Sequence, residues 1–124
     1  MRLQEIEHAL GMVRGAPWAD LRNLFLMGHS EGGAAVARWE GNGFKALIIS
    51  GSRCPNGIRA SSVIPVLAIR FEQDPWARGK LSCGSWLSGR GNATEIKLAG
   101  SGHDTSRSPE AQDAVLNFLR LQRT

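Results

Sequence analysis

The chain is poor in cysteine, with two residues of this type, Cys54 and Cys83, among its 124 residues. Two cysteines are too few for a disulfide scaffold, so we expect reduced thiols and a cytoplasmic location. No apolar run approaches the roughly 20 residues that a membrane helix needs. The first residues carry acids and form no apolar h-region, so neither a signal peptide nor a membrane partner is expected.

Motifs for metals, nucleotides and nucleic acids are also missing. The three histidines are dispersed, and neither C-x-x-C nor H-x-x-x-H spacing occurs. The glycines at 28–33 do not fit the dinucleotide fingerprint, and no Gly-Lys-Ser/Thr follows them as in a phosphate loop. The net charge of +4 is small, and the arginines are scattered. We therefore expect no metal, no cofactor and no nucleic-acid partner.

The composition is that of an ordinary folded domain. The hydrophobic fraction is 42% and the charged fraction is 21%, which leaves enough apolar surface to offset the entropy of ordering. A chain of 124 residues allows one domain with a modest core. No internal repeat or long linker divides the chain, so a single domain over 1–124 is expected.

Apolar patterning predicts helices that alternate with strands. Helices are expected over 2–13, over 31–39 and after Ser108, with a loop or short helix over 78–92. Strands are expected over 24–27, 44–50, 63–69 and 94–98. The first three strands are continuous apolar runs, typical of strands buried on both faces, whereas 94–98 alternates like an edge strand. This order predicts an α/β fold with about four mostly parallel strands and flanking helices.

The strongest chemical motif is G-x-S-x-G at 28–32, between an expected strand and an expected helix. That context is the one a nucleophile elbow requires. Gly28 and Gly32 flank Ser30 because a Cβ at either place is expected to collide with a neighbouring element. The sharp turn exposes Ser30 Oγ, and it aims the backbone N–H of Glu31 towards a developing oxyanion. The alternative is an ordinary glycine-rich turn with an N-cap serine.

An elbow serine needs a base and an orienting acid, which follow it in the chain order acid, then histidine. His103 is the one histidine downstream of the elbow, and it lies just past the last expected strand. Asp74 follows the strand at 63–69 and is the preferred acid. Glu72 and Asp104 are its rivals. Asp104 adjoins His103, and neighbouring side chains on an extended loop tend to diverge.

With these residues the chain resembles the α/β-hydrolase superfamily, and within it most closely the dienelactone-hydrolase-like and related esterase branch. The resemblance rests on the elbow segment 24–33, on 64–69 through Asp74-Pro75, and on Gly102-His103-Asp104. It implies that the strand at 24–27 matches the family's fifth strand, and that the last three strands match its sixth to eighth. The chain therefore resembles the C-terminal half of the family's fold.

Two consequences follow from that partial resemblance. The family's first four strands are absent, together with the loop that normally supplies the second oxyanion N–H. The strand at 24–27 is then expected to have a bare edge, which invites pairing with a second copy or with a separate N-terminal half. Phe71 also stands where the family often has a glycine, so the turn before Asp74 is expected to differ.

The resemblance implies a serine hydrolase that acts on a small-molecule ester or similar acyl group through Ser30, His103 and Asp74. A peptidase of the same fold remains an alternative, as does an inactive fragment that serves as a dimerising or partner-binding module. His29 is expected to pack beneath Ser30, with contact to substrate as the alternative. Trp76 and Trp86 are candidates for the wall of an acyl pocket, although packing in the core or at the rim explains them as well.

Overall fold

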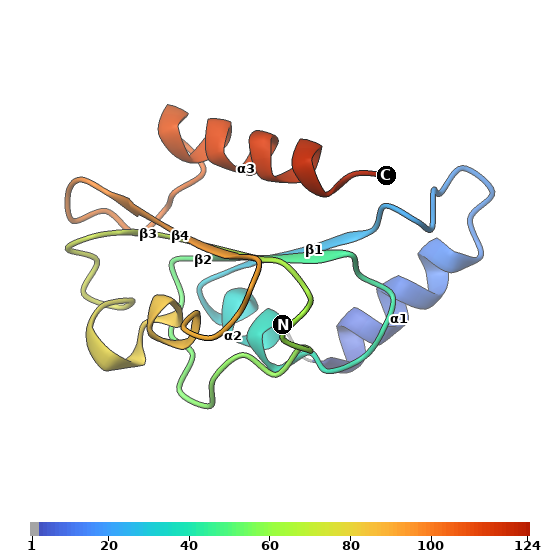
Figure 1. Cartoon of the computed structure of the whole chain (residues 1–124), viewed down its shortest axis with the longest axis horizontal. Coiled ribbons are helices and arrows are strands. Elements are labelled where there is room, and N and C mark those ends of the chain that lie inside the picture. Colours follow the sequence, from blue (N-terminus) through green and yellow to red (C-terminus); the bar gives the residue numbers. More distant parts are fainter. Residues whose placement is uncertain (1–2) are drawn as a thin grey trace.

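A parallel sheet lies between two layers of helices in the computed structural model, which describes residues 3–124. Helix α3 covers one face of the sheet, and α1 and α2 lie on the other face (Figure 1). The helices are α1 (Leu3–Arg14), α2 (Glu31–Arg38) and α3 (Pro109–Gln122), and the strands are β1 (Phe25–His29), β2 (Ala46–Ser50), β3 (Val66–Phe71) and β4 (Ala93–Leu98). Two short 3₁₀ helices, Gly79–Leu81 and Cys83–Trp86, occupy the stretch expected to be a loop or short helix.

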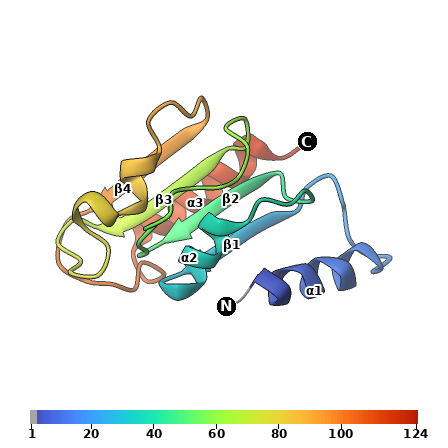
Figure 2. The ribbon, with the colours of Figure 1, turned by 90° about the horizontal axis from the view of Figure 1, so that it is seen from below.

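The four strands follow one another in the order β1-β2-β3-β4, and every neighbouring pair is parallel (Figure 2). The expected α/β fold class is confirmed, and so is the position of β4 at an edge. The burial expected for the first strand is wrong, because β1 forms the other edge and Met27 is 47% exposed. An apolar run can be mistaken for a central strand because composition does not reveal which neighbours are present.

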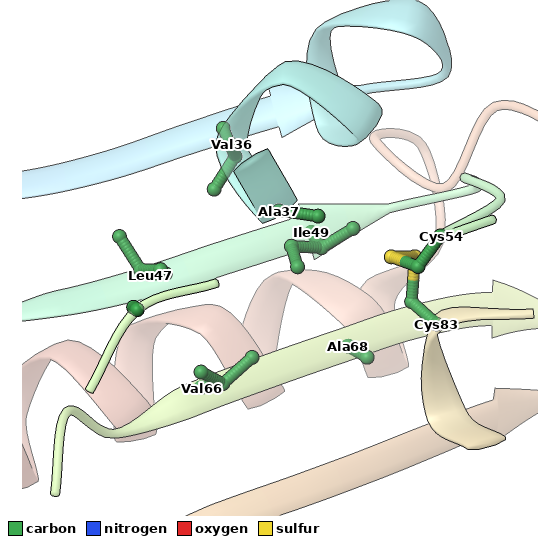
Figure 3. Packing of buried hydrophobic residues seen from close by; sticks show 9 residues of the cluster. Val36, Ala37, Leu47, Ile49, Cys54, Val66, Ala68 and Cys83 are labelled. Carbon is green, nitrogen blue, oxygen red and sulfur yellow. A yellow bond between two sulfur atoms is a disulfide. The ribbon is translucent and has the colours of Figure 1, made fainter. Parts of the chain in front are cut away.

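The core lies on both faces of β2 and β3. All five residues of β2 are buried, and their side chains alternate between the two faces. Leu47 and Ile49 point towards Val36 of α2 (Figure 3), whereas Ile48 packs on the side of α3 with Phe118. Both helical layers therefore pack against the two central strands. Hydrogen bonding between β2 and β3 fixes the relative positions of the carboxyl ends of these strands.

Helix α3 begins as the sequence predicts. The Ser108 hydroxyl accepts a hydrogen bond from the backbone N–H of Ala111 at 3.2 Å, and Pro109 occupies the first helical position. Ala111 and Phe118 are buried against the sheet, whereas Leu121 near the end of the helix is 80% exposed. Leu119 packs against the core near the end of the helix instead.

The two cysteines correct the sequence-based prediction. Cys54 and Cys83 form a disulfide, with their Cα atoms 4.8 Å apart (Figure 3). Both residues are buried in the core cluster on the α2 side of the sheet. Two cysteines are too few for a disulfide-stabilised fold, but they can still form a single disulfide when the two loops that carry them pack together. The expected cytoplasmic location thereby loses the support of reduced thiols.

Within residues 3–124, no helix combines the length and the apolar character needed to cross a membrane.

Candidate active site

Ser30 occupies a sharp turn between β1 and α2. Its φ is +56° and its ψ is −119°, and it is the one non-glycine residue with positive φ in the described part of the chain. Such a backbone conformation costs on the order of 1–3 kcal/mol and persists only where its surroundings hold it. Here the Ser30 N–H donates to the Ser50 carbonyl at 2.9 Å, and the Ser52 hydroxyl donates to the Ser30 carbonyl at 2.8 Å.

This turn requires glycine because the backbone of β1 and the backbone of the first turn of α2 lie very close together. A Cβ on Gly28 would lie 2.2 Å from the carbonyl oxygen of Gly32. The strand and the start of the helix can therefore meet only because Gly28 has no side chain. Gly33 has a similar role that the sequence did not reveal, since its Cβ would lie 2.7 Å from Cβ of Ser52.

Gly28→Ala is expected to lower the free energy of unfolding by about 3 kcal/mol, because the added methyl meets rigid backbone and cannot be relieved by a rotamer change. Urea unfolding of the two proteins measures the difference. Gly11→Ala is the matched control: nothing lies within 4 Å of its Cβ position in α1, so it should stabilise the protein by about 0.5–1 kcal/mol. Equal stability of Gly28→Ala and the parent would show that the turn is not built as described.

Asp74 and His103 meet at the carboxyl ends of β3 and β4. The Asp74 side chain is fully buried, and its Oδ2 lies 2.6 Å from Nδ1 of His103. Its other oxygen, Oδ1, accepts a hydrogen bond from the Trp76 N–H at 2.9 Å. Both carboxylate oxygens are thus occupied, and the imidazole is held through Nδ1 with a third of the His103 side chain left exposed.

The loops that carry these two residues are joined by backbone hydrogen bonds. The N–H of Glu72 donates to the Leu98 carbonyl at 2.8 Å, and the N–H of Gln73 donates to the Gly100 carbonyl at 2.9 Å. Phe71, expected to alter the turn, does not carry Asp74 away from His103. Its ring packs under Gly102, where a Cβ would lie 3.0 Å from Cε2 of Phe71.

The two rival acids lie elsewhere. The Glu72 side chain is exposed. Asp104 accepts hydrogen bonds from the Ser106 N–H at 2.9 Å and from the Ser106 hydroxyl at 2.7 Å. These hydrogen bonds, the one from the side chain first, lower the pKa of Asp104. Asp104 therefore stabilises its own turn, and Asp74 is the carboxylate that contacts the histidine.

His29 is exposed, so the expectation that it is buried beneath Ser30 is wrong. Its ring lies beside that of His103, with centroids 4.7 Å apart, and its Nδ1 is hydrogen-bonded to Ser50 Oγ at 2.9 Å. Ser50 is in turn hydrogen-bonded to Thr105 Oγ1 at 2.7 Å, and both are buried. This polar chain was not foreseen. Its one sequence signal is a serine at the end of an otherwise apolar strand.

The structure places His103 next to the residue that precedes Ser30, but the last link of a triad is not closed. Within residues 3–124, no hydrogen bond joins Ser30 Oγ to His103. In unliganded sites such bonds are often long and tighten only when substrate binds. Ser30, Asp74 and His103 thus all follow the carboxyl ends of strands of the sheet, and the contact between Asp74 and His103 is already formed.

A pocket of about 240 Å³ opens beside Ser30, and Glu31, Arg53 and Trp76 line it together with Ala34, Gly51, Ser52 and Pro55. Trp86 lies outside this pocket and packs over Gly57 instead. The Glu31 N–H belongs to the first turn of α2, where backbone N–H groups have no partner within the helix.

No cluster of three or more His, Cys, Asp and Glu side chains in the described residues has the arrangement of a metal site.

Comparisons with known proteins identify the fold. No protein-family model matches the chain, and no curated protein sequence matches it. A solved structure that it resembles is that of a SOBER1 variant from Arabidopsis thaliana, with a TM-score of 0.71 and 14% sequence identity. The match covers 98% of this chain and 64% of the other. SOBER1 has the α/β-hydrolase fold, so this chain shares that fold over 64% of the length of its neighbour.

Proposed function

We propose that the chain is a serine hydrolase that cleaves an ester or similar acyl bond of a small molecule. One observation carries the proposal. The buried carboxylate of Asp74 lies 2.6 Å from Nδ1 of His103, and both residues follow carboxyl ends of strands, as does Ser30 with its left-handed φ. The hydrolase fold of the structural neighbour supports it. Resemblance to the esterase branch favours esters as substrates, and a peptidase is the alternative within the same fold.

In the proposed reaction, Ser30 Oγ attacks the carbonyl carbon and its proton passes to Nε2 of His103. Asp74 keeps the proton of the imidazole on Nδ1 and stabilises the imidazolium that forms. The Glu31 N–H donates to the oxyanion. His103 then gives its proton to the leaving oxygen as the bond to the acyl carbon breaks. Water, deprotonated by His103, releases the acid from the acyl-Ser30 intermediate.

The rate should be modest for a single reason. We include in the proposal that the family's loop for the second oxyanion donor has no match in this chain, and such a donor is worth roughly 10²–10³ in kcat. The proposal therefore predicts slow turnover of activated esters and, by comparison, readier covalent reaction with a probe.

A fluorophosphonate probe tests the assignment directly. The purified chain should be labelled at Ser30, and Ser30→Ala should lose all labelling because the probe bonds to the nucleophile. Ser101→Ala is the control, since this exposed serine lies two residues before His103 and should label as the parent does. A folded chain that resists the probe would contradict the proposal.

A second candidate function is favoured by the unpaired edge of β1. Two copies that pair through this edge would form a dimerising module without catalysis. A groove of about 420 Å³ beside the edge, lined by Met27 and Leu116 among others, would add apolar contact. Sedimentation of the chain and of Met27→Glu tests this candidate. A dimer that the substitution dissociates, in a chain that the probe does not label, would favour it over the hydrolase.

A further inference from the structure

We propose that Arg53 makes this site select acyl groups that carry a carboxylate. The inference rests on the proposed function, because it takes Ser30 as the nucleophile next to which the carboxylate must bind. It concerns a residue outside the elbow, the acid loop and the histidine loop. Arg53 lies three residues after the end of β2 and lines the same pocket as Ser30.

The Arg53 side chain is held in place by Trp76, which lines the same pocket. Its Nε donates to the backbone carbonyl of Trp76 at 2.6 Å. Its guanidinium carbon lies 5.8 Å from the centre of the Trp76 ring, within the distance of a cation–π contact. Its backbone pairs with Ser82, next to the Cys54–Cys83 disulfide. Little rotamer entropy is then lost when an anion binds.

The remaining donors of Arg53 are free for a ligand. Nη1 and Nη2 have no hydrogen-bond partner, and Arg53 forms no ion pair with any residue over 3–124. The two nitrogens form the planar fork that matches a carboxylate with two parallel hydrogen bonds. Arg53 is an exposed residue, so these donors can exchange solvent for the carboxylate of a ligand in the pocket that Arg53 lines.

The rest of the lining decides which anion fits. Glu31 is the one acid on the pocket wall, and its carboxylate opposes a second negative charge, so a monoanion is favoured over a phosphate dianion. Ala34 and Pro55 supply apolar surface to the same pocket. The volume of about 240 Å³ is smaller than the roughly 300–1,000 Å³ of sites for drug-sized ligands. A short acyl chain that ends in a carboxylate fits the single negative charge, the apolar lining and the small volume of the pocket.

The kinetic test compares one anionic and one neutral substrate: the mono-p-nitrophenyl ester of glutaric acid and p-nitrophenyl valerate. The parent should prefer the glutarate ester in kcat/KM. Arg53→Gln should lower the ratio of the two kcat/KM values roughly 10- to 100-fold, the worth of a hydrogen-bonded charge. Arg53→Lys, which keeps the charge but loses the fork, should lie between. Arg78→Gln, an exposed arginine outside the pocket, should leave the ratio unchanged. An unchanged ratio in Arg53→Gln would overturn the inference.

A binding experiment separates this inference from the proposed function. Glutarate is titrated into the full-length Ser30→Ala chain, followed by amide chemical shifts. Shifts at Arg53 and Trp76 that disappear in the Ser30→Ala/Arg53→Gln double variant would support the carboxylate site even if the parent hydrolysed neither ester. Absence of such shifts in Ser30→Ala would overturn it, even where the fluorophosphonate probe labels Ser30 in the parent.

Discussion

Asp74→Asn lowers kcat for ester hydrolysis by roughly 10³- to 10⁴-fold, the loss expected when the orienting acid of a serine triad becomes an amide. The side-chain oxygen of asparagine can still accept from the Trp76 N–H, as Oδ1 of Asp74 does. Its amide nitrogen then faces Nδ1 of His103 and donates to it. The imidazole must place its proton on Nε2, so it can no longer accept the proton of Ser30.

Steady-state kinetics on the parent and the variant measure this loss, with circular dichroism to show that the fold is kept. The two rival acids are the matched controls. Glu72→Gln and Asp104→Asn should each retain kcat within about twofold, because the first side chain is exposed and the second is engaged by Ser106. A large loss in Asp104→Asn together with a small one in Asp74→Asn would assign the acid to Asp104.

Reduction of the Cys54–Cys83 disulfide lowers the free energy of unfolding by about 3–4 kcal/mol, because the unfolded chain gains the freedom of a loop closed over 29 residues. The melting temperature should fall by roughly 10–15 °C for a chain of this size. Urea unfolding of the protein with and without a phosphine reductant measures the change without altering any side chain.

The double variant Cys54→Ala/Cys83→Ala is the control for the reductant, which should leave its unfolding midpoint unchanged. A thiol titration in denaturant should find no free thiol before reduction and two after it. Two free thiols in the protein as purified would show that the pair is not joined, and would restore the reduced state expected from the sequence. The loop that the disulfide closes contains Asp74, so loss of stability there should also loosen the acid.

The elbow could be predicted from six adjacent residues because its cause is local. Gly28 must lack a Cβ so that its backbone can meet the Gly32 carbonyl, and Ser30 must take a left-handed φ between them. The pairing of Asp74 with His103 was reached in a different way, from chain order alone. This prediction is confirmed because parallel strands all have their carboxyl ends on the same side of the sheet, whatever residues lie between the strands.

Contacts between residues that are distant in the sequence could not be predicted from local motifs or from chain order. His29 was expected beneath Ser30, yet it is exposed at the end of the edge strand β1, and its Nδ1 is hydrogen-bonded to Ser50 Oγ. Arg53 drew no attention in the sequence, since an isolated arginine in a loop has no motif. Its place in the pocket is visible only through the Trp76 carbonyl that holds it.

By itself, the sequence determined the features set by neighbouring residues: the alternation of helices and strands, the elbow at Ser30, and the order in which serine, acid and histidine occur. Tertiary structure alone decided which side chains meet. It paired Cys54 with Cys83, exposed His29, and placed Arg53 in the same pocket as Ser30. The physical reason is that backbone sterics act over a few residues, whereas a contact between loops depends on the register of every strand that separates them.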